Sequence, residues 1–370
     1  MNENRVVKTF MELASISSPS RHEENVRNYI FNRLEPYHLV IEEDNTGDAI
    51  GGTTGNIIIK IKGKQKKHIL FDAHMDTVGP CENIHVILDG DTIHTDHTTV
   101  LGADDKAGLA CLLELIDTIM EQEEYAGPDL TFIFTVCEED SLQGVKHLDE
   151  KYFKDADFAY ILDGDGSPCK AVNKTPYGCK GELYITGKEA HSGVCPEEGV
   201  NALYVAAQAI VKCPNGRIDD ATTCNMGTIT GGRAKNIVMG DVKIEFEARS
   251  FELPKLQEVI ETVKAQFQQA ADEYHATFTH TLKYGTPGYT VEEDAPIVEN
   301  LKEAMDACGL DLQLISCGGG SNANIYHMKG LEALNIGAGA YKEHSKDEYL
   351  KIDELLQASN VIKQMVLNHK

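Results

Sequence analysis

Short apolar segments constrain the fold of this chain more than any other feature of its sequence. Residues 130–136 and 158–162 are rich in apolar side chains at successive positions, as expected of strands that are buried on both faces of a sheet. Residues 106–120 instead repeat leucine and isoleucine at helical spacing. Strands that alternate with helices predict an α/β domain in which helices cover both faces of the sheet.

The region after Asn173 has a different order of predicted elements. Strands and helices are expected there over residues 177–186, 199–212, 226–230, 238–250, 254–274 and 276–283. Their order, βαββαβ, is that of the split βαβ, or ferredoxin-like, fold. It predicts a separate α+β unit.

The α/β pattern then resumes. The expected elements are a helix over 296–308, a strand near 334–337 and a closing helix after Lys351. We therefore predict a discontinuous α/β domain over residues 1–172 and 288–370, interrupted by an inserted domain over residues 173–287.

Local signals mark the starts of two helices. Ser20 and Glu23 have the spacing of a capping box, which predicts a helix from there to Leu34. Pro254 fits the first turn of the helix over 254–274.

Charge and composition exclude several classes of function. The formal net charge is −25, so the surface repels phosphate backbones and anionic lipids, and we expect neither a nucleic-acid nor a membrane partner. The ten cysteines include no C-x-x-C pair, and the first twenty residues lack the apolar core of a secretion signal. We therefore expect reduced thiols and a cytoplasmic location.

Three segments place histidine or acidic residues where predicted strands end or a helix begins. His74 follows an apolar strand, and Asp76, two residues later, could hold the second nitrogen of its ring. Asp104 lies in a glycine-flanked loop that enters the helix over 106–120, whereas Asp105 fits an acid favoured by the helix dipole. Asp163 ends the strand over 158–162. For His74 alone, a metal ligand and a surface histidine are equally consistent with the sequence.

Two further segments complete the pattern. Glu138 and Glu139 follow the strand over 130–136, where adjacent like charges need either solvent or a cation. If a cation is present, one glutamate could bind it while the other acts as a base. His344 lies in a loop after the last predicted strand of the α/β domain. Together these segments predict a metal site at the ends of the strands.

The motifs HMDTV, GADDKAG, EED, LDGDG and EHS resemble, in this order, those of the co-catalytic zinc peptidase and deacylase family, in its peptidase T-like branch. The resemblance covers essentially the whole chain. It implies a catalytic domain with a mixed sheet between helices and an inserted ferredoxin-like domain that serves as a lid and dimerisation domain. A homodimer formed through that domain is therefore expected.

The resemblance also implies roles for the residues of the predicted metal site. Asp104 would bridge two Zn²⁺ ions, for which Co²⁺ or Mn²⁺ could substitute. His74 and Asp163 would complete one site, and Glu139 and His344 the other. Glu138 would be the general base, Asp76 would hold His74, and the Asp104–Asp105 peptide bond would be cis.

Further residues of the family pattern would bind the substrate. His191, in the inserted domain, corresponds to a donor that stabilises the reaction's oxyanion and that several relatives take from the neighbouring subunit. Asn236 and Arg249 resemble a pair that binds a substrate carboxylate. The glycine-rich loop that contains Gly319 and Gly320 resembles a pocket wall. It is followed by Asn322, where relatives generally have aspartate, and this difference predicts less negative charge near the pocket.

The predicted function is hydrolysis of small peptides by a zinc-dependent exopeptidase, with a tripeptide aminopeptidase as the nearest type. A zinc-activated water would attack the peptide bond, with Glu138 taking its proton. An amidase or deacylase of N-acyl amino acids is the alternative within hydrolases, because both kinds of substrate end in a carboxylate. A binding protein without catalytic activity is the alternative outside them.

Overall fold

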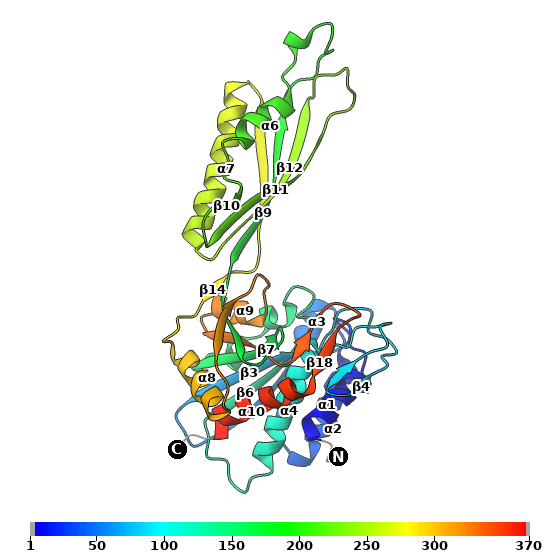
Figure 1. Cartoon of the computed structure of the whole chain (residues 1–370), viewed down its shortest axis with the longest axis vertical. Helices are drawn as coiled ribbons and strands as arrows, with labels where there is room; N and C mark the ends of the chain where they lie inside the picture. Colours follow the sequence, from blue (N-terminus) through cyan, green and yellow to red (C-terminus); the bar gives the residue numbers. More distant parts are fainter. Residues whose placement is uncertain (1–3, 368–370) are drawn as a thin grey trace. The chain divides into compact units, whose positions relative to one another are not determined.

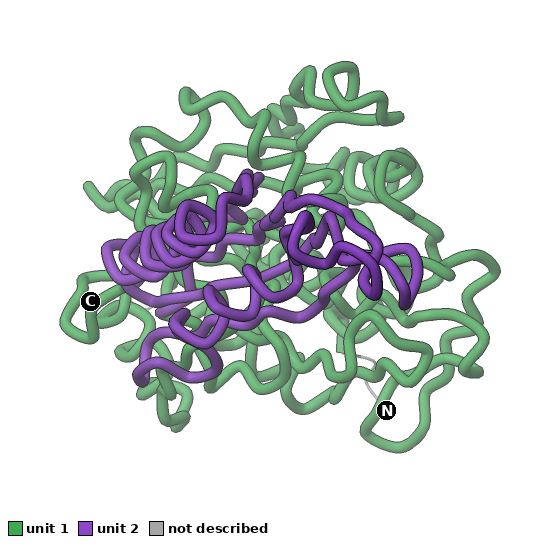
Figure 2. Tube along the Cα trace, turned by 90° about the horizontal axis from the view of Figure 1, so that it is seen from above, with its two compact units in different colours: residues 1–173, 291–370 green, residues 174–290 purple. Residues whose placement is uncertain are grey.

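The computed structural model describes residues 4–367 and divides the chain into two compact units. Unit 1 comprises residues 1–173 and 291–370, and unit 2 comprises residues 174–290 (Figure 2). None of the helices in the described part of the chain is long and apolar enough to cross a membrane.

The larger sheet of unit 1 has a parallel centre. Its strand order is β1-β2-β6-β3-β7-β16-β8-β14, with β15 paired to β8, and β6, β3, β7 and β16 run parallel to one another. The strands are β1 Ile41–Glu43, β2 Ile57–Ile61, β3 His68–His74, β6 Asp129–Thr135, β7 Phe158–Gly164, β8 Lys170–Thr175, β14 Tyr289–Thr290, β15 Gln313–Ser316 and β16 Ala333–Gly337. The central strands are buried along most of their length, as their apolar sequences predict.

Helices cover this sheet on two sides (Figure 1). Helix α4 packs on β3 and β7 and contacts α1 and α10, while α9 packs on β7 and β16 and contacts α5. The helices of unit 1 are α1 Arg5–Ala14, α2 Glu24–Leu34, η1 Glu35–Tyr37, α3 Thr46–Ile50, α4 Ala103–Met120, α5 Gln143–His147, η2 Glu150–Tyr152, α8 Pro296–Ala307, α9 Asn322–Met328 and α10 Ile352–Leu367. The prediction of an α/β domain with a mixed sheet between helices is confirmed.

A small antiparallel sheet joins two distant parts of unit 1. Its order is β17-β18-β5-β4, with β4 Ile87–Asp89, β5 Thr92–His94, β17 Ala340–Tyr341 and β18 Tyr349–Lys351. The β17–β18 connection carries His344, so this sheet fixes the base of the loop that presents that side chain.

Unit 2 is an antiparallel sheet covered by two helices on one face. Its order is β10-β11-β12-β9-β13, and the elements are β9 Tyr177–Thr186, η3 Pro196–Glu198, α6 Ala202–Ile210, β10 Gly216–Arg217, β11 Thr222–Gly231, β12 Asp241–Ser250, α7 Leu253–Glu273 and β13 Thr277–Tyr284. Along β12, buried and partly exposed residues alternate, and the buried ones pack with α6 and α7 in one apolar core. The ferredoxin-like order expected for the inserted region is confirmed.

The predicted capping box near Ser20 is wrong. Helix α2 begins at Glu24, and the Ser20 hydroxyl donates a 2.6 Å hydrogen bond to Asp76 instead of to the start of that helix. Glu23 is completely buried, and its carboxylate accepts hydrogen bonds from the backbone N–H groups of Arg21 and Cys137. Both side chains are therefore used for tertiary contacts.

Candidate metal centre

The five predicted metal ligands lie at one edge of the central sheet. His74 ends β3, Asp163 lies near the end of β7, and Glu139 follows β6. Because these three neighbouring strands are parallel, their carboxyl ends meet at the same edge. Asp104, at the start of α4, and His344, in the β17–β18 connection, are brought to that edge by loops.

The side chains converge on Asp104. One oxygen of Asp104, Oδ1, lies 2.8 Å from His74 Nε2, and the other, Oδ2, lies 3.2 Å from His344 Nε2. His344 Nε2 is also 3.0 Å from Glu139 Oε1, and His74 Nε2 is 3.8 Å from Asp163 Oδ1. The Asp104 carboxylate therefore lies between the two imidazoles, as a bridging ligand would.

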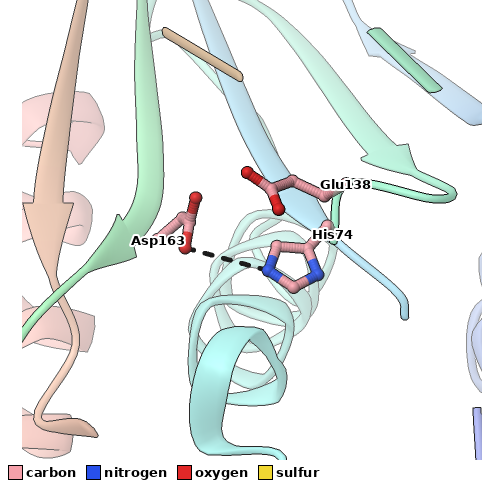
Figure 3. A group of neighbouring side chains, drawn as sticks. All are labelled: His74, Glu138 and Asp163. Carbon is pink, nitrogen blue, oxygen red and sulfur yellow. Dashed lines mark ion pairs between the residues drawn. The ribbon is translucent and has the colours of Figure 1, made fainter. Parts of the chain in front are cut away.

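Two sets of possible ligand atoms lie close enough together to hold a metal ion. His74, Glu138 and Asp163 form one set, in which the side chains point toward one another (Figure 3). His74, Asp104 and Glu139 form the other, and in each set all the ligand atoms lie within 4.8 Å of one another. Imidazole nitrogens and carboxylate oxygens are donors that suit zinc and similar divalent ions. The residues present thus fit a metal centre.

The pKa shifts in this cluster are also those expected of a group of metal ligands. Burial, and then repulsion by Asp104, raise the pKa of Asp163 to about 8. Burial and the nearby Asp163 also raise the pKa of Glu138. Hydrogen bonds to Asp104 and Glu139 raise the pKa of His344 to about 11. Protons are thus held tightly by a crowded group of carboxylates, and a divalent cation in their place would relieve the repulsion.

Asp76 lies beside the Nδ1 atom of His74. The Nδ1 atom of His74 lies 2.8 Å from the backbone carbonyl of Asp76 and 3.4 Å from its carboxylate. The carboxylate accepts hydrogen bonds from the backbone N–H groups of Glu138, at 2.9 Å, and Glu139, at 3.2 Å. Asp76 therefore contacts His74 through both its main chain and its side chain, and the side chain also fixes the turn that carries the two glutamates.

Asp105 also differs from expectation. The Asp104–Asp105 peptide bond is cis, as predicted, and Asp105 has a non-helical backbone conformation. Its carboxylate is buried and accepts hydrogen bonds from the backbone N–H groups of His74 and Gly108, each at 3.1 Å. The interpretation of Asp105 as a residue that only complements the helix dipole is therefore wrong, because it ties α4 to the end of β3.

Other supporting residues have no signal in the sequence. The side chain of Asn335 on β16 accepts a 3.1 Å hydrogen bond from the backbone N–H of Asp163. It also donates a 2.9 Å hydrogen bond to the backbone carbonyl of Asp163. The carboxylate of Glu348 accepts hydrogen bonds from the backbone N–H groups of Leu101, Gly102 and Asp104. Glu348 is close to His344 in the sequence, but in a chain with 59 acidic residues this proximity indicates nothing.

The effect of Asn322 on the charge near the pocket stays a prediction, but the side chain has buried partners inside unit 1. Asn322 is the first residue of α9 and is only 1% exposed. Its Nδ2 donates to Asp72 Oδ1 and to Thr135 Oγ1, both at 2.8 Å. The Gly319 and Gly320 residues before it are exposed and lead into the Ser321 cap of α9. The amide therefore serves a buried hydrogen-bond network inside unit 1.

The three predicted substrate-binding residues of unit 2 fall into two places. The backbone N–H of Ser192 donates to the carbonyl of Asn236 at 3.1 Å, and His191 forms a β-bridge with Ile237, so His191 and Asn236 are neighbours. Arg249 lies at the far end of β12, a strand that starts at Asp241, which puts it about 26 Å from that start at the usual rise per residue. Arg249 hydrogen-bonds Glu247 there. Arg249 is thus distant from the start of β12, and its role beside Asn236 stays a prediction.

Comparisons with known proteins identify the family of this chain. The sequence pattern of peptidase family M20/M25/M40 matches residues 70–368. The uncharacterized protein YqjE of Bacillus subtilis is 36% identical over 363 residues, covering 98% of this chain and 97% of YqjE.

Two crystal structures are similar over nearly the whole chain. The aminopeptidase PepT of Bacillus cereus has a TM-score of 0.92 and 34% identity, with 99% of this chain and 98% of that chain covered. A tripeptidase of Staphylococcus aureus has a TM-score of 0.88 and 31% identity, with the same coverage. The predicted resemblance is thereby confirmed, and this chain belongs to peptidase family M20/M25/M40.

Proposed function

We propose that this protein is a two-metal exopeptidase that removes the amino-terminal residue of short peptides, with tripeptides as the first candidates. The observation that carries the proposal is the position of Asp104, with one carboxylate oxygen near His74 and the other near His344. Asp163 and Glu139 lie beside these two imidazoles and would complete the two sites. The similarity to an aminopeptidase and a tripeptidase supports the choice of substrate.

Two Zn²⁺ ions in this cluster would polarise the scissile carbonyl and activate a water molecule; Co²⁺ or Mn²⁺ are possible substitutes. Glu138 is the general base: it accepts a proton from the water and passes it to the leaving amine. The backbone N–H of Glu138 is held by Asp76, so the base has a fixed position relative to His74. His191 would donate to the developing oxyanion, and Arg249 would bind the peptide carboxylate as a bidentate guanidinium.

We also propose a homodimer formed through unit 2, as the resemblance implies. His191 and Asn236 are neighbours, whereas Arg249 lies at the other end of β12. In the proposed dimer one subunit would supply His191 to the active site of the other, as the resemblance implies. A cytoplasmic location remains a prediction from the cysteines, all ten of which are free.

The test is a comparison of matched substrates. The metal-free protein is loaded with Zn²⁺ and incubated with a tripeptide, its N-acetylated form and its carboxyl-terminal amide, and the products are identified by mass spectrometry. The proposal expects release of the first residue from the free tripeptide and slower cleavage of the amide, which lacks the carboxylate for Arg249. Cleavage of only the N-acetylated substrate would instead establish the deacylase alternative, and binding of all three without cleavage would contradict both.

A further inference from the structure

The loop before Asp104 is held by an acidic side chain that belongs to a distant segment. Glu348 is 2% exposed, and its Oε2 accepts hydrogen bonds from the backbone N–H groups of Leu101 and Gly102, both at 2.8 Å. Its Oε1 accepts from the backbone N–H of Asp104 at 3.1 Å. Every one of these donors lies in the segment that brings Asp104 to the metal centre.

This contact replaces a local helix cap. Gly102 occupies the N-cap position of α4 and has no side chain with which to cap it. Its φ of 71° is in the left-handed region, and a Cβ there would lie 2.8 Å from the side chain of Thr77, so a capping residue is unfavourable at this position. The N–H groups at the start of this helix therefore donate hydrogen bonds to Glu348, which is more than 240 positions away in the sequence.

The same Glu348 stands at the base of the loop that carries His344. The strands β17 and β18 pair through Tyr341 and Tyr349 and close this loop. Inside it, the Ser345 hydroxyl donates to the Lys342 carbonyl at 2.7 Å, and the backbone N–H of Glu348 donates to the Ser345 carbonyl at 3.2 Å. Glu348 is thus bonded to Ser345, the residue that directly follows His344 in this loop.

The central sheet does not set the distance between Asp104 and His344. His74 and Asp163 lie on β3 and β7, which pair directly, so their separation follows from the strand register. Asp104 and His344 come from loops instead. The three hydrogen bonds of Glu348 link the segment after His344 directly to the backbone at Asp104 and the residues before it.

We propose that Glu348 is a positioning residue that sets the distance between Asp104 and His344 and thereby the affinity of the second metal site, formed by Asp104, Glu139 and His344. The inference rests on the two-metal centre proposed above. Glu348 itself is not a ligand, and its effect passes through the backbone of Asp104 and the loop of His344. Loss of a residue that orients ligands typically weakens metal binding by about 10- to 100-fold.

The test is a Co²⁺ titration of the metal-free full-length protein, followed by calorimetry and by the visible absorption of bound cobalt. The variant Glu348→Gln keeps the size of the side chain, but its NH₂ group cannot accept a hydrogen bond from the backbone. We expect the first equivalent to bind within about threefold of the wild-type affinity and the second to bind about 10- to 100-fold more weakly. At limiting metal kcat falls, and excess metal restores it with little change in KM.

Glu114→Gln is the matched control. Glu114 is also buried, on α4, and its carboxylate pairs with Arg5 and Lys363, away from the metal centre. This variant is expected to lose folding stability and to bind both Co²⁺ ions like the wild type. If Glu348→Gln behaves like Glu114→Gln, with lower stability and two wild-type affinities, the proposal is overturned.

Two further comparisons keep the test decisive. If Glu348→Gln does not fold, Glu348→Asp, which keeps the charge but is one methylene shorter, is titrated in its place, and wild-type affinity for the second ion in that variant overturns the proposal. If the wild type itself binds fewer than two ions, the two-metal function fails. If it binds two and the variants bind both ions with wild-type affinity, only the role of Glu348 fails.

Discussion

The Nδ2 atom of Asn322 donates a 2.8 Å hydrogen bond to Oδ1 of Asp72, and so joins the first residue of α9 to the middle of β3. Asp72 has no exposed surface, and it also accepts a 2.7 Å hydrogen bond from the hydroxyl of Tyr326. Burial raises the pKa of Asp72 to about 6, against the effect of these two donors. The Asn322 amide therefore helps to stabilise the buried carboxylate of Asp72 by donating a hydrogen bond to it.

Exchanging this amide for a carboxylate should destabilise the fold. Asn322→Asp places two carboxyl groups side by side and removes a donor to Asp72, so we expect a loss of roughly 3 kcal/mol in the free energy of unfolding. Urea denaturation measures this loss. The double variant Asp72→Asn with Asn322→Asp restores one amide and one carboxylate, and should recover most of it. A neutral effect of Asn322→Asp alone would contradict the paired arrangement.

Replacing the proposed base should stop turnover without removing metal. Glu138→Gln keeps the shape of a side chain that is 8% exposed but cannot accept the proton from water, so kcat should fall by about 10²- to 10⁴-fold. Steady-state kinetics and metal analysis of the same sample measure both quantities. Asp140→Asn is the control, since Asp140 follows in the same turn but pairs with Arg21 on the surface. Loss of metal from Glu138→Gln with unchanged turnover would refute the role as base.

Removing the metals should lower stability, and more so as the pH rises. Without metal, the raised pKa of Asp163, about 8, means that the folded state binds a proton more tightly than the unfolded state, so stability falls as the pH rises from about 4 towards 8. The raised pKa of His344, about 11, has the same sign: its contribution is present below the ordinary histidine pKa and is lost as the pH rises towards 11.

Thermal unfolding with and without a chelator, from pH 5 to pH 9, measures this effect. The difference in Tm between the metal-loaded and metal-free protein should grow across the range. His344→Gln removes one of the two contributions and should flatten the metal-free curve. A metal-free protein that becomes more stable with rising pH would contradict these shifts.

The proposed exchange of His191 between subunits can be tested with two inactive variants. Each of the variants Glu138→Gln and His191→Ala is expected to be inactive alone. The first lacks the proposed base, and the second lacks the proposed oxyanion donor. In a mixed dimer, the subunit with an intact Glu138 receives His191 from its partner, so one of its two sites works. Random pairing of co-expressed chains gives half mixed dimers, and hence about a quarter of wild-type activity. Purified mixed dimers without activity would place His191 in its own subunit's site.

Local patterns in the sequence were sufficient for most of the architecture. The strand predicted over 177–186 is β9, and the helix predicted over 254–274 differs from α7 by one residue at each end. Hydrophobic periodicity and proline at a helix start depend on neighbours within one turn or strand, so they can be read without the fold. The βαββαβ order followed from the same signals.

The candidate site was predictable only as a set of residue types at element ends. His74 and Asp163 end parallel strands, and such ends meet at one edge of a sheet. The motifs supplied Asp104 and His344 by resemblance. No local pattern places the Asp104 carboxylate between two imidazoles, because this depends on loops joined across 240 residues.

The sequence by itself thus determined the elements, their order and the polar residues at their ends, because each depends on short-range periodicity and conformational preference. Only the tertiary structure decided the hydrogen-bond partners. Ser20 bonds Asp76 rather than capping a helix, and Asn322 bonds Asp72, 250 positions away in the sequence. Glu348 caps α4 from the far end of the chain. The physical reason is that a buried polar group bonds to whichever group packing brings within reach, and its sequence neighbours do not determine that choice.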